Sequence, residues 1–309
     1  MRDCGGCRVN SPLVTVGIPF FNVRRWLANA IRSVFAQSFS DWEMVLLDDG
    51  STDGSAEIAL AIDDPRVRVH LGRENLKVAV RRNEVVQLAR GKYLAWLDGD
   101  DLMHPERLQK EVRFLEENRD VDVVGAGMYV VDQEGNAIGK RLPRADGKLS
   151  CRPCDLPLMQ GTVMGKLEWF RRNPYDPSLA RVQDMDLWLR TAPYSRFANL
   201  HEPLYFYTEF ETFSFRRYRV ACSFVRKVIK RHGPRIIGPF NTQKEIVKTY
   251  LKLGVYAAAC CCGAERMLLR QRSESLSAVE KADAQMILDR IRKQELPLRA
   301  PLRLGSEGA

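Results

Sequence analysis

The chain has 309 residues and a formal net charge of +9, with 45% apolar and 28% charged residues. These fractions are ordinary for a soluble globular protein, and the length is enough for one large core or for one core with a smaller appendage. Of the late segments, residues 253–264 are the most hydrophobic, but twelve residues are too few to cross a bilayer, which needs about 20. The length of this segment therefore excludes it as a membrane-spanning helix.

The positive charge is unevenly distributed and predicts an acidic partner. Eight Lys or Arg residues and no Asp or Glu occur between Arg216 and Arg235. An anionic membrane surface, a phosphorylated acceptor and nucleic acid all fit such a segment, and a solvated helix face is the alternative. The first residues lack an apolar signal-peptide region. We therefore expect a cytoplasmic protein, with contact to the inner face of the membrane as a further hypothesis.

The eight cysteines include two Cys-x-x-Cys pairs, Cys4/Cys7 and Cys151/Cys154. Together they have the ligand types of a four-thiolate zinc site. Their separation is far longer than in a compact zinc module, so the sequence leaves open whether they bind anything.

Residues 13–132 alternate between strand-like and helix-like patterns. Short apolar runs predict strands at 13–19, 43–47, 67–71 and 93–97, with later strands at 121–124 and 128–132. Helical spacing follows each of the first four runs. Arg82 falls on the apolar stripe of the third helix, and such conflicts tend to mark functional sites. This alternation predicts an α/β fold with a mostly parallel sheet flanked by helices.

The later part of the chain looks helical after about Arg216. Breaks are expected at Gly233-Pro234 and Gly238-Pro239. The segment Ser277–Glu280 has the pattern of a capping box and predicts the start of a final helix.

Three polar clusters follow predicted strands, at Phe21-Asn22, Asp48-Asp49 and Asp98–Asp101. Ligands of parallel α/β sheets bind beyond the carboxyl ends of the strands, so the clusters are expected to converge. Asp98 and Asp100 are two positions apart on an extended chain and project to the same side. Such a pair suits Mg²⁺ or Mn²⁺ together with substrate phosphates. A charged β-turn is the alternative for this segment.

The chain resembles the family 2 glycosyltransferases of the GT-A fold. The stretches that carry the resemblance are residues 14–22, 45–53, 82–83, 91–101 and 183–190, in the family's order and spacing. The resemblance covers about residues 12–210. It implies a Rossmann-like GT-A domain at 12–215, with a nucleotide-binding half at 12–132 and an acceptor half at 133–215. A loose leader at 1–11, a helical region at 216–296 and a loose tail at 297–309 complete the expected organisation.

The resemblance also assigns roles to individual residues. It implies transfer of a sugar from a nucleoside diphosphate sugar to an acceptor hydroxyl, with inversion. Arg82 is expected near the diphosphate or holding Asp98–Asp101, Asp98 at the ribose or the metal, and Asp100 on the divalent cation, Mg²⁺ or Mn²⁺. Asp184 is the expected catalytic base, with Asp186 as its competitor; a carboxylate that stabilises a helix N-terminus is the alternative. The residues expected to bind the nucleotide are Pro19, Phe21, Asn22, Asp48, Asp49 and Ser51.

Three positions depart from the family pattern. Gln183 stands where the family usually has Glu before the base, and Lys77 where it often has Gly. The segment 207–210 contains no histidine at the place where the family often has one. Glu209 or Glu211 is a candidate substitute for it, or the metal relies on Asp100, phosphate and water.

The expected partners are a nucleotide-sugar donor, with a UDP-sugar favoured, and a saccharide or lipid-linked acceptor. The product is expected in surface polysaccharide, lipopolysaccharide or another glycan, and no nucleic acid partner is expected. Two other functions stay open: a non-catalytic nucleotide-sugar-binding or membrane-surface scaffold, and a sugar nucleotidyltransferase. The latter is disfavoured, because the loop at 19–22 has no glycine to cradle a triphosphate.

Overall fold

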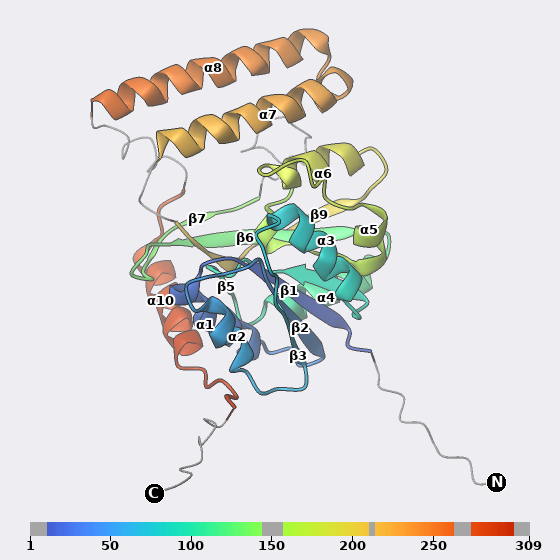
Figure 1. Cartoon of the computed structure of the whole chain (residues 1–309), viewed down its shortest axis with the longest axis vertical. Helices are drawn as coiled ribbons and strands as arrows, with labels where there is room; N and C mark the ends of the chain where they lie inside the picture. The colour runs from blue at the N-terminus through green and yellow to red at the C-terminus, as the bar shows by residue number, and fades with distance from the viewer. Residues whose placement is uncertain (1–10, 144–156, 210–213, 263–272, 300–309) are drawn as a thin grey trace, which may run out of the picture.

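The computed structural model describes residues 11–143, 157–209, 214–262 and 273–299. Its centre is one mixed sheet with the strand order β3-β2-β1-β4-β8-β6-β9-β5, to which β7 adds by pairing with β6 (Figure 1). The strands are β1 (Val14–Phe20), β2 (Trp42–Asp48), β3 (Val67–His70), β4 (Tyr93–Trp96), β5 (Leu102–Met103), β6 (Val123–Val131), β7 (Ala137–Arg141), β8 (Met164–Lys166) and β9 (Phe197–Thr208).

Helices cover both faces of the sheet. Apolar side chains of α1, α2 and α4 pack in the core on one face, and those of α3, α5 and α6 pack on the other. A short 3-10 helix, η2 (Gln160–Thr162), precedes β8. The helices in the described ranges are α1 (Arg24–Phe35), α2 (Ser55–Leu60), α3 (Val78–Leu88), α4 (Arg107–Glu117), α5 (Leu167–Arg172), α6 (Gln183–Thr191), α7 (Phe215–Ile236), α8 (Pro239–Cys261) and α10 (Ala278–Arg292).

Parallel pairing brings the first strand ends to one edge. Strand β1 pairs in parallel with both β2 and β4, and β2 pairs in parallel with β3. In this register Phe20 lies opposite Asp48, and Gly17 opposite Trp96. The predicted α/β class with a mostly parallel sheet is confirmed, and the segments after β1, β2 and β4 open on the same side.

Two element boundaries differ from the sequence-based expectation. The strands expected at 121–124 and 128–132 form one strand, β6, because its glycines allow irregular pairing with β9 between Ala126 and Tyr129. Helix α7 continues past Pro234 for two residues, and only the Gly238-Pro239 break separates α7 from α8. A side chain at Gly233 would collide with Thr242 of α8, so this glycine serves close helix packing.

The helical region after residue 215 divides into two parts. Helices α7 and α8 lie side by side at one end of the molecule, and α7 packs on α6 (Figure 1). Helix α10 begins with the predicted capping box at Ser277 and Glu280, and it packs on α1 and β7 instead. None of the helices in the described ranges has both the length and the apolar character that a membrane span needs.

The tail expected to be loose from 297 is ordered at its start. Leu298 forms an antiparallel bridge with Ile62, and the backbone N–H of Asp63 donates to the carbonyl of Pro297 at 2.7 Å. These bonds satisfy backbone groups at the end of α2, so residues 297–299 belong to the sheet domain. Residues 300–309, residues 1–10 of the expected leader at 1–11, and the two Cys-x-x-Cys pairs lie outside the described residues.

A buried arginine ties β4 to the segment before β8. Arg107 of α4 donates to the carbonyls of Trp96 and Val163, at 3.0 and 3.1 Å, and to the carboxylate of Glu111. Both side chains of this ion pair are fully buried. Burial raises the pKa of Glu111 to about 7, and the charge of Arg107 opposes that rise. The pair therefore fixes the strand that leads into Asp98–Asp101.

Arg107→Ala is expected to lower the free energy of unfolding by about 4 kcal/mol, because it leaves a buried carboxylate without its charged partner and removes one donor from each of two carbonyls. Urea unfolding measures this change. Arg113→Ala is the matched control, since Arg113 and Glu117 form a pair with the same spacing on the same helix but in solvent. The control should unfold with the wild-type midpoint. Equal midpoints for the two variants would show that the buried pair contributes little.

Candidate functional site

The loops after β1 and β2 are joined by reciprocal hydrogen bonds. The Asn22 side-chain oxygen accepts from the backbone N–H of Thr52 at 2.8 Å, and the Ser51 hydroxyl accepts from the N–H of Asn22 at 3.0 Å. Asn22 has a φ of +52°, a left-handed conformation that Asn tolerates better than most residues. Beside it the Phe21 ring is 42% exposed, which leaves an aromatic face available to a ligand.

Asp48 and Asp49 are buried and hold the backbone of the neighbouring loops. Asp48 accepts from the N–H groups of Gly50 and Ser51, and Asp49 accepts from the N–H of Leu76 at 2.7 Å. The guanidinium of Arg81 also donates to Asp49, at 2.8 Å. These bonds shape the loops beyond β2 and β3, while contact of the two carboxylates with a nucleotide stays a prediction.

Lys77 occupies a backbone conformation that suits glycine. Its φ of 75° and ψ of 158° fall in a region that is essentially restricted to glycine, and α3 starts at the next residue. Its N–H donates to Asp49, so the hydrogen bonding of the loop holds it there. This is the position at which the family often has glycine, and the positive φ gives the physical reason.

Arg82 is buried between two of the predicted site carboxylates. Its Nη2 donates to Asp98 at 2.9 Å, and its guanidinium lies 5.6 Å from the ring centre of Tyr175. Burial disfavours the charged form, yet Asp98 and Asp184 help hold the pKa of Arg82 above its usual value. Its Nε and Nη1 find no hydrogen-bond acceptor among the described residues. Both nitrogens are buried, so the positive charge is only partly compensated by hydrogen bonds within the described residues.

Asp184 lies at the start of α6, partly buried. Burial raises the pKa of this carboxyl above its usual value, and the positive charge of Arg82 counteracts the rise. Asp184 and Asp98 therefore both interact electrostatically with the guanidinium of Arg82. The sequence alone does not reveal this shared partner.

Asp186, the competitor for the role of base, is fully buried and bound elsewhere. It accepts from Arg231 at 2.8 Å and lies 2.9 Å from His232, both on α7. Although burial opposes ionisation, these hydrogen bonds hold the pKa of Asp186 below its usual value. Asp186 therefore fastens α6 to α7.

The turn Asp98–Asp101 is held from β9. Asp101 accepts from the Tyr205 hydroxyl at 2.8 Å and from the N–H of Thr208 at 2.7 Å. The Thr208 hydroxyl donates to the carbonyl of Asp100 at 2.6 Å. Burial, together with the charges of Asp100 and Asp98, places the pKa of Asp101 well above its usual range. Asp101 is thus a supporting residue of the turn.

Two observations on Asp100 suit a divalent cation. Asp100 lines a cavity of about 180 Å³. Burial and the nearby charge of Asp98 raise the pKa of Asp100 to about 6, so a positive charge beside these two carboxylates would favour their ionised forms. Three-residue metal clusters of His, Cys, Asp and Glu do not occur within the described ranges. A cation here would need oxygens from a bound diphosphate or water as well.

Of the two candidate substitutes for the missing histidine, Glu209 lies within the described residues and Glu211 does not. Glu209 forms an ion pair with Arg141 at 2.6 Å, which directs its carboxylate to β7. Glu211 lies outside the described residues. A role for either residue in metal binding stays a prediction.

Several residues that build the site could not be identified from the sequence pattern. Arg81 came closest to being identifiable, because this second charge, next to Arg82, also interrupts the apolar pattern of the helix. Tyr175 lies in an irregular segment. Tyr205 and Thr208 lie in an apolar run whose pairing with residues about 100 positions earlier cannot be read from spacing.

A family model described as Glycosyl transferase family 2 matches residues 15–178. The putative glycosyltransferase EpsE of Bacillus subtilis (strain 168) is 36% identical over 203 residues, which are 63% of this chain and 73% of that protein. The putative teichuronic acid biosynthesis glycosyltransferase TuaG of the same strain is 36% identical over 131 residues, 42% of this chain and 52% of that protein.

Two solved structures share the fold. Staphylococcus aureus TarS 1–349 in complex with UDP has a TM-score of 0.56 at 17% identity, over 77% of this chain and 70% of that chain. The mannosyltransferase PcManGT from Pyrobaculum calidifontis, in complex with GDP-Man and Mn²⁺, has a TM-score of 0.55 at 15% identity, over 92% and 87% of the two chains. At these identities the comparison establishes the fold alone.

Lys77→Gly is expected to raise the free energy of unfolding by about 1 kcal/mol, because glycine adopts this backbone conformation without strain. Urea unfolding measures the change. Lys77→Ala is the control: it removes the long side chain but keeps Cβ and the strain. If the two variants have equal stability, the strain at position 77 is negligible.

Proposed function

This chain belongs to glycosyltransferase family 2, and from that premise we propose that it transfers a sugar from a nucleoside diphosphate sugar to an acceptor hydroxyl, with inversion. The observation that supports the proposal most is the buried Arg82, which is hydrogen-bonded to Asp98 and electrostatically coupled to Asp184. A guanidinium with two unpaired N–H groups suits a diphosphate oxygen, for which Arg is a common partner.

Asp184 acts as the general base in this proposal. It accepts the proton of the acceptor hydroxyl while the hydroxyl oxygen forms a bond to the anomeric carbon. The bond from that carbon to the donor diphosphate breaks in the same step, and the diphosphate departs with the electron pair. A single displacement inverts the anomeric centre and needs no nucleophilic residue. Burial raises the pKa of Asp184, and the positive charge of Arg82 opposes that rise and so favours the carboxylate form that a base needs.

Asp98 and Asp100 would hold the divalent cation, Mg²⁺ or Mn²⁺, which supplies positive charge near the leaving diphosphate when bound. Tyr205 and Thr208 keep these carboxylates in place through Asp101. Arg82 anchors Asp98 from the other side and presents its remaining N–H groups to the diphosphate.

The loops beyond β1 and β2 form the proposed nucleotide pocket. Phe21 covers the base, and the loop held by Asp48, Asp49 and Ser51 frames it. Asn22 joins the two loops, and Pro19 is the last residue but one of β1. A UDP-sugar is the proposed donor. TarS with UDP and PcManGT with GDP-Man support a nucleotide sugar as the donor class.

Polysaccharide synthesis at the cell envelope is the proposed setting, with a saccharide or lipid-linked acceptor at the inner face of the membrane. The similarity to TuaG, a putative teichuronic acid biosynthesis glycosyltransferase, supports this setting. A non-catalytic nucleotide-sugar-binding protein is the second candidate, favoured by Gln183 at a position where the family usually has Glu.

Asp184→Asn is expected to lower kcat by about 10²–10⁴-fold, because the amide cannot accept the proton. Binding of UDP, measured by calorimetry, should stay within about two-fold of wild type, since Asp184 serves the acceptor. Asp186→Asn is the matched control on the same helix. It should keep its turnover but lose about 2 kcal/mol of stability with its bonds to α7. Near-normal turnover in Asp184→Asn would remove it from the role of base.

Phe21→Ala is expected to weaken UDP binding about ten-fold, because base–aromatic stacking contributes roughly 1–3 kcal/mol. Isothermal titration measures the affinity. Leu71→Ala serves as the control, since Leu71 is also an exposed apolar residue close to a strand end. An unchanged affinity in Phe21→Ala would place the base elsewhere.

A further inference from the structure

Helix α8 exposes an apolar face on the side opposite its contact with α7. Its inner face includes the buried residues Thr242 and Ile246. Val247, Leu251 and Val255 follow each other at intervals of four residues, so they form one ridge that points away from the inner face. Each of these three side chains is more than half exposed. Phe240, at the start of the helix, is 82% exposed on the same side.

A ridge of lysines runs beside the apolar ridge. Lys244, Lys248 and Lys252 are also four residues apart, and two of them directly follow Val247 and Leu251 in the chain. Residues 214–262 contain eleven Lys or Arg residues and a single acidic residue, Glu245. Glu245 accepts from Lys248 at 2.7 Å. An apolar stripe bordered by lysines is the pattern of a helix that lies in a membrane interface.

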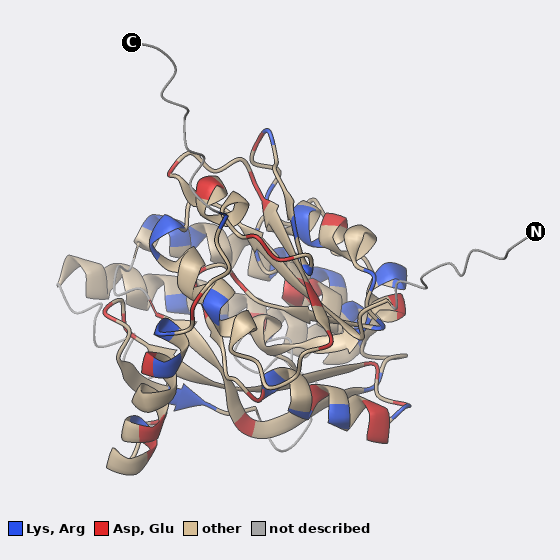
Figure 2. Cartoon of the chain, turned by 90° about the horizontal axis from the view of Figure 1, so that it is seen from below, with Lys and Arg blue, Asp and Glu red and all other residues tan. Residues whose placement is uncertain are grey.

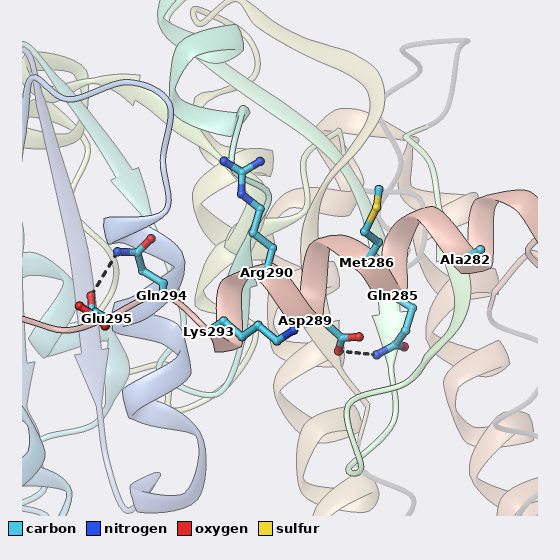
Figure 3. Close-up of a pocket in the computed structure, with 8 residues that line it drawn as sticks. All are labelled: Ala282, Gln285, Met286, Asp289, Arg290, Lys293, Gln294 and Glu295. Carbon is cyan, nitrogen blue, oxygen red and sulfur yellow. Dashed lines mark hydrogen bonds between the residues drawn. The ribbon is translucent and has the colours of Figure 1, made fainter.

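The excess of positive charge on α7 and α8 contrasts with the mixed charges seen elsewhere on the molecule. Figure 2 views the chain from the end opposite α8, where acidic and basic residues are interspersed. Figure 3 shows a pocket along α10 and the residues that follow it, where Asp289, Arg290, Lys293 and Glu295 likewise mix both signs. The α7–α8 pair is the part of the described chain in which an apolar face and a strong excess of positive charge coincide.

The pair is anchored to the helix of the proposed base. Leu179, Met185 and Leu189 around α6 pack with Val225 and Val228 of α7, and Asp186 is bonded to α7. In Figure 1, α7 lies between α6 and α8, which is the outermost layer. A surface bound to the outer face of α8 would therefore be separated from α6 by α8 and α7.

We propose that the outward face of α8 docks this protein on an anionic lipid surface, with Val247, Leu251 and Val255 inserted and the lysines at the headgroups. Negative headgroups complement the positive charge of α7 and α8. A second copy fits less well, because two such faces would bring their lysine ridges together with almost no carboxylates between them. Docking needs no transfer reaction, so its failure and the failure of the proposed function are separate results.

The test is co-sedimentation of the full chain with vesicles of phosphatidylcholine, alone or with about a third phosphatidylglycerol. The wild type should bind the anionic vesicles at least about ten-fold more tightly than the neutral ones, and added salt should weaken binding. Val247→Glu/Leu251→Glu should lose at least about ten-fold in affinity for the anionic vesicles.

Val279→Glu/Met286→Glu is the matched control, because these side chains are at least as exposed as Val247 and Leu251 but lie on α10. It should bind vesicles like the wild type, and both variants should bind UDP like the wild type. Lys244→Gln/Lys252→Gln provides a second variant on α8, with a weaker and less salt-dependent binding expected.

Vesicle binding that is absent in the wild type, or unchanged in both α8 variants, would overturn the proposal. The same holds if light scattering shows a wild-type dimer that Val247→Glu/Leu251→Glu dissociates while vesicles are not bound. That result would assign the face to a second copy of the chain.

Discussion

The site depends on one buried positive charge. Arg82 has almost no exposed surface, and a guanidinium taken out of water is costly unless carboxylates and hydrogen bonds compensate it. Asp98 supplies one hydrogen bond, and Asp184 supplies a nearby negative charge. Because two N–H donors have no acceptor in the described chain, compensation is incomplete without a ligand. An anionic donor is the kind of ligand that completes it.

The surrounding structure holds this arrangement from several directions. Arg107 fixes the end of β4, and Tyr205 with Thr208 fixes the turn that follows it. Strained backbone conformations occur in the same region. Within the described ranges, positive φ angles at non-glycine residues are found at Asn22, Lys77 and Val182, which lie just before α1, α3 and α6. Conformations of this kind persist only where surrounding contacts impose them, and they cluster at functional sites. The loops at this sheet edge are therefore held in place before any ligand binds.

The fold class could be predicted because the apolar repeats of strands and helices, with periods of 2 and 3.6 residues, are local patterns. The residues at the ends of β1, β2 and β4 could be grouped because parallel strands end at the same edge of a sheet. Arg82 stood out since a charge interrupted an apolar stripe. Its bond to Asp98 could not be predicted, because it joins α3 to the turn after β4 through side-chain geometry. The support of Asp101 by Tyr205 was equally hidden, since β9 enters the sheet beside β5 from about 100 residues away. The order at 297–299 could not be predicted from the sequence, because the hydrogen bonds of this segment to 61–63 join backbone groups, which carry no side-chain signal.

Arg82 lowers the pKa of the Asp184 carboxyl against the opposing effect of burial. The direct measurement of this influence is the pH dependence of kcat, at saturating donor, for the wild type and for Arg82→Gln. Loss of the guanidinium removes the charge that lowers the pKa of Asp184, so the acidic limb of the profile should move to higher pH in a variant that still unfolds cooperatively. An acidic limb that stays at the wild-type pH would contradict this influence of Arg82 on Asp184.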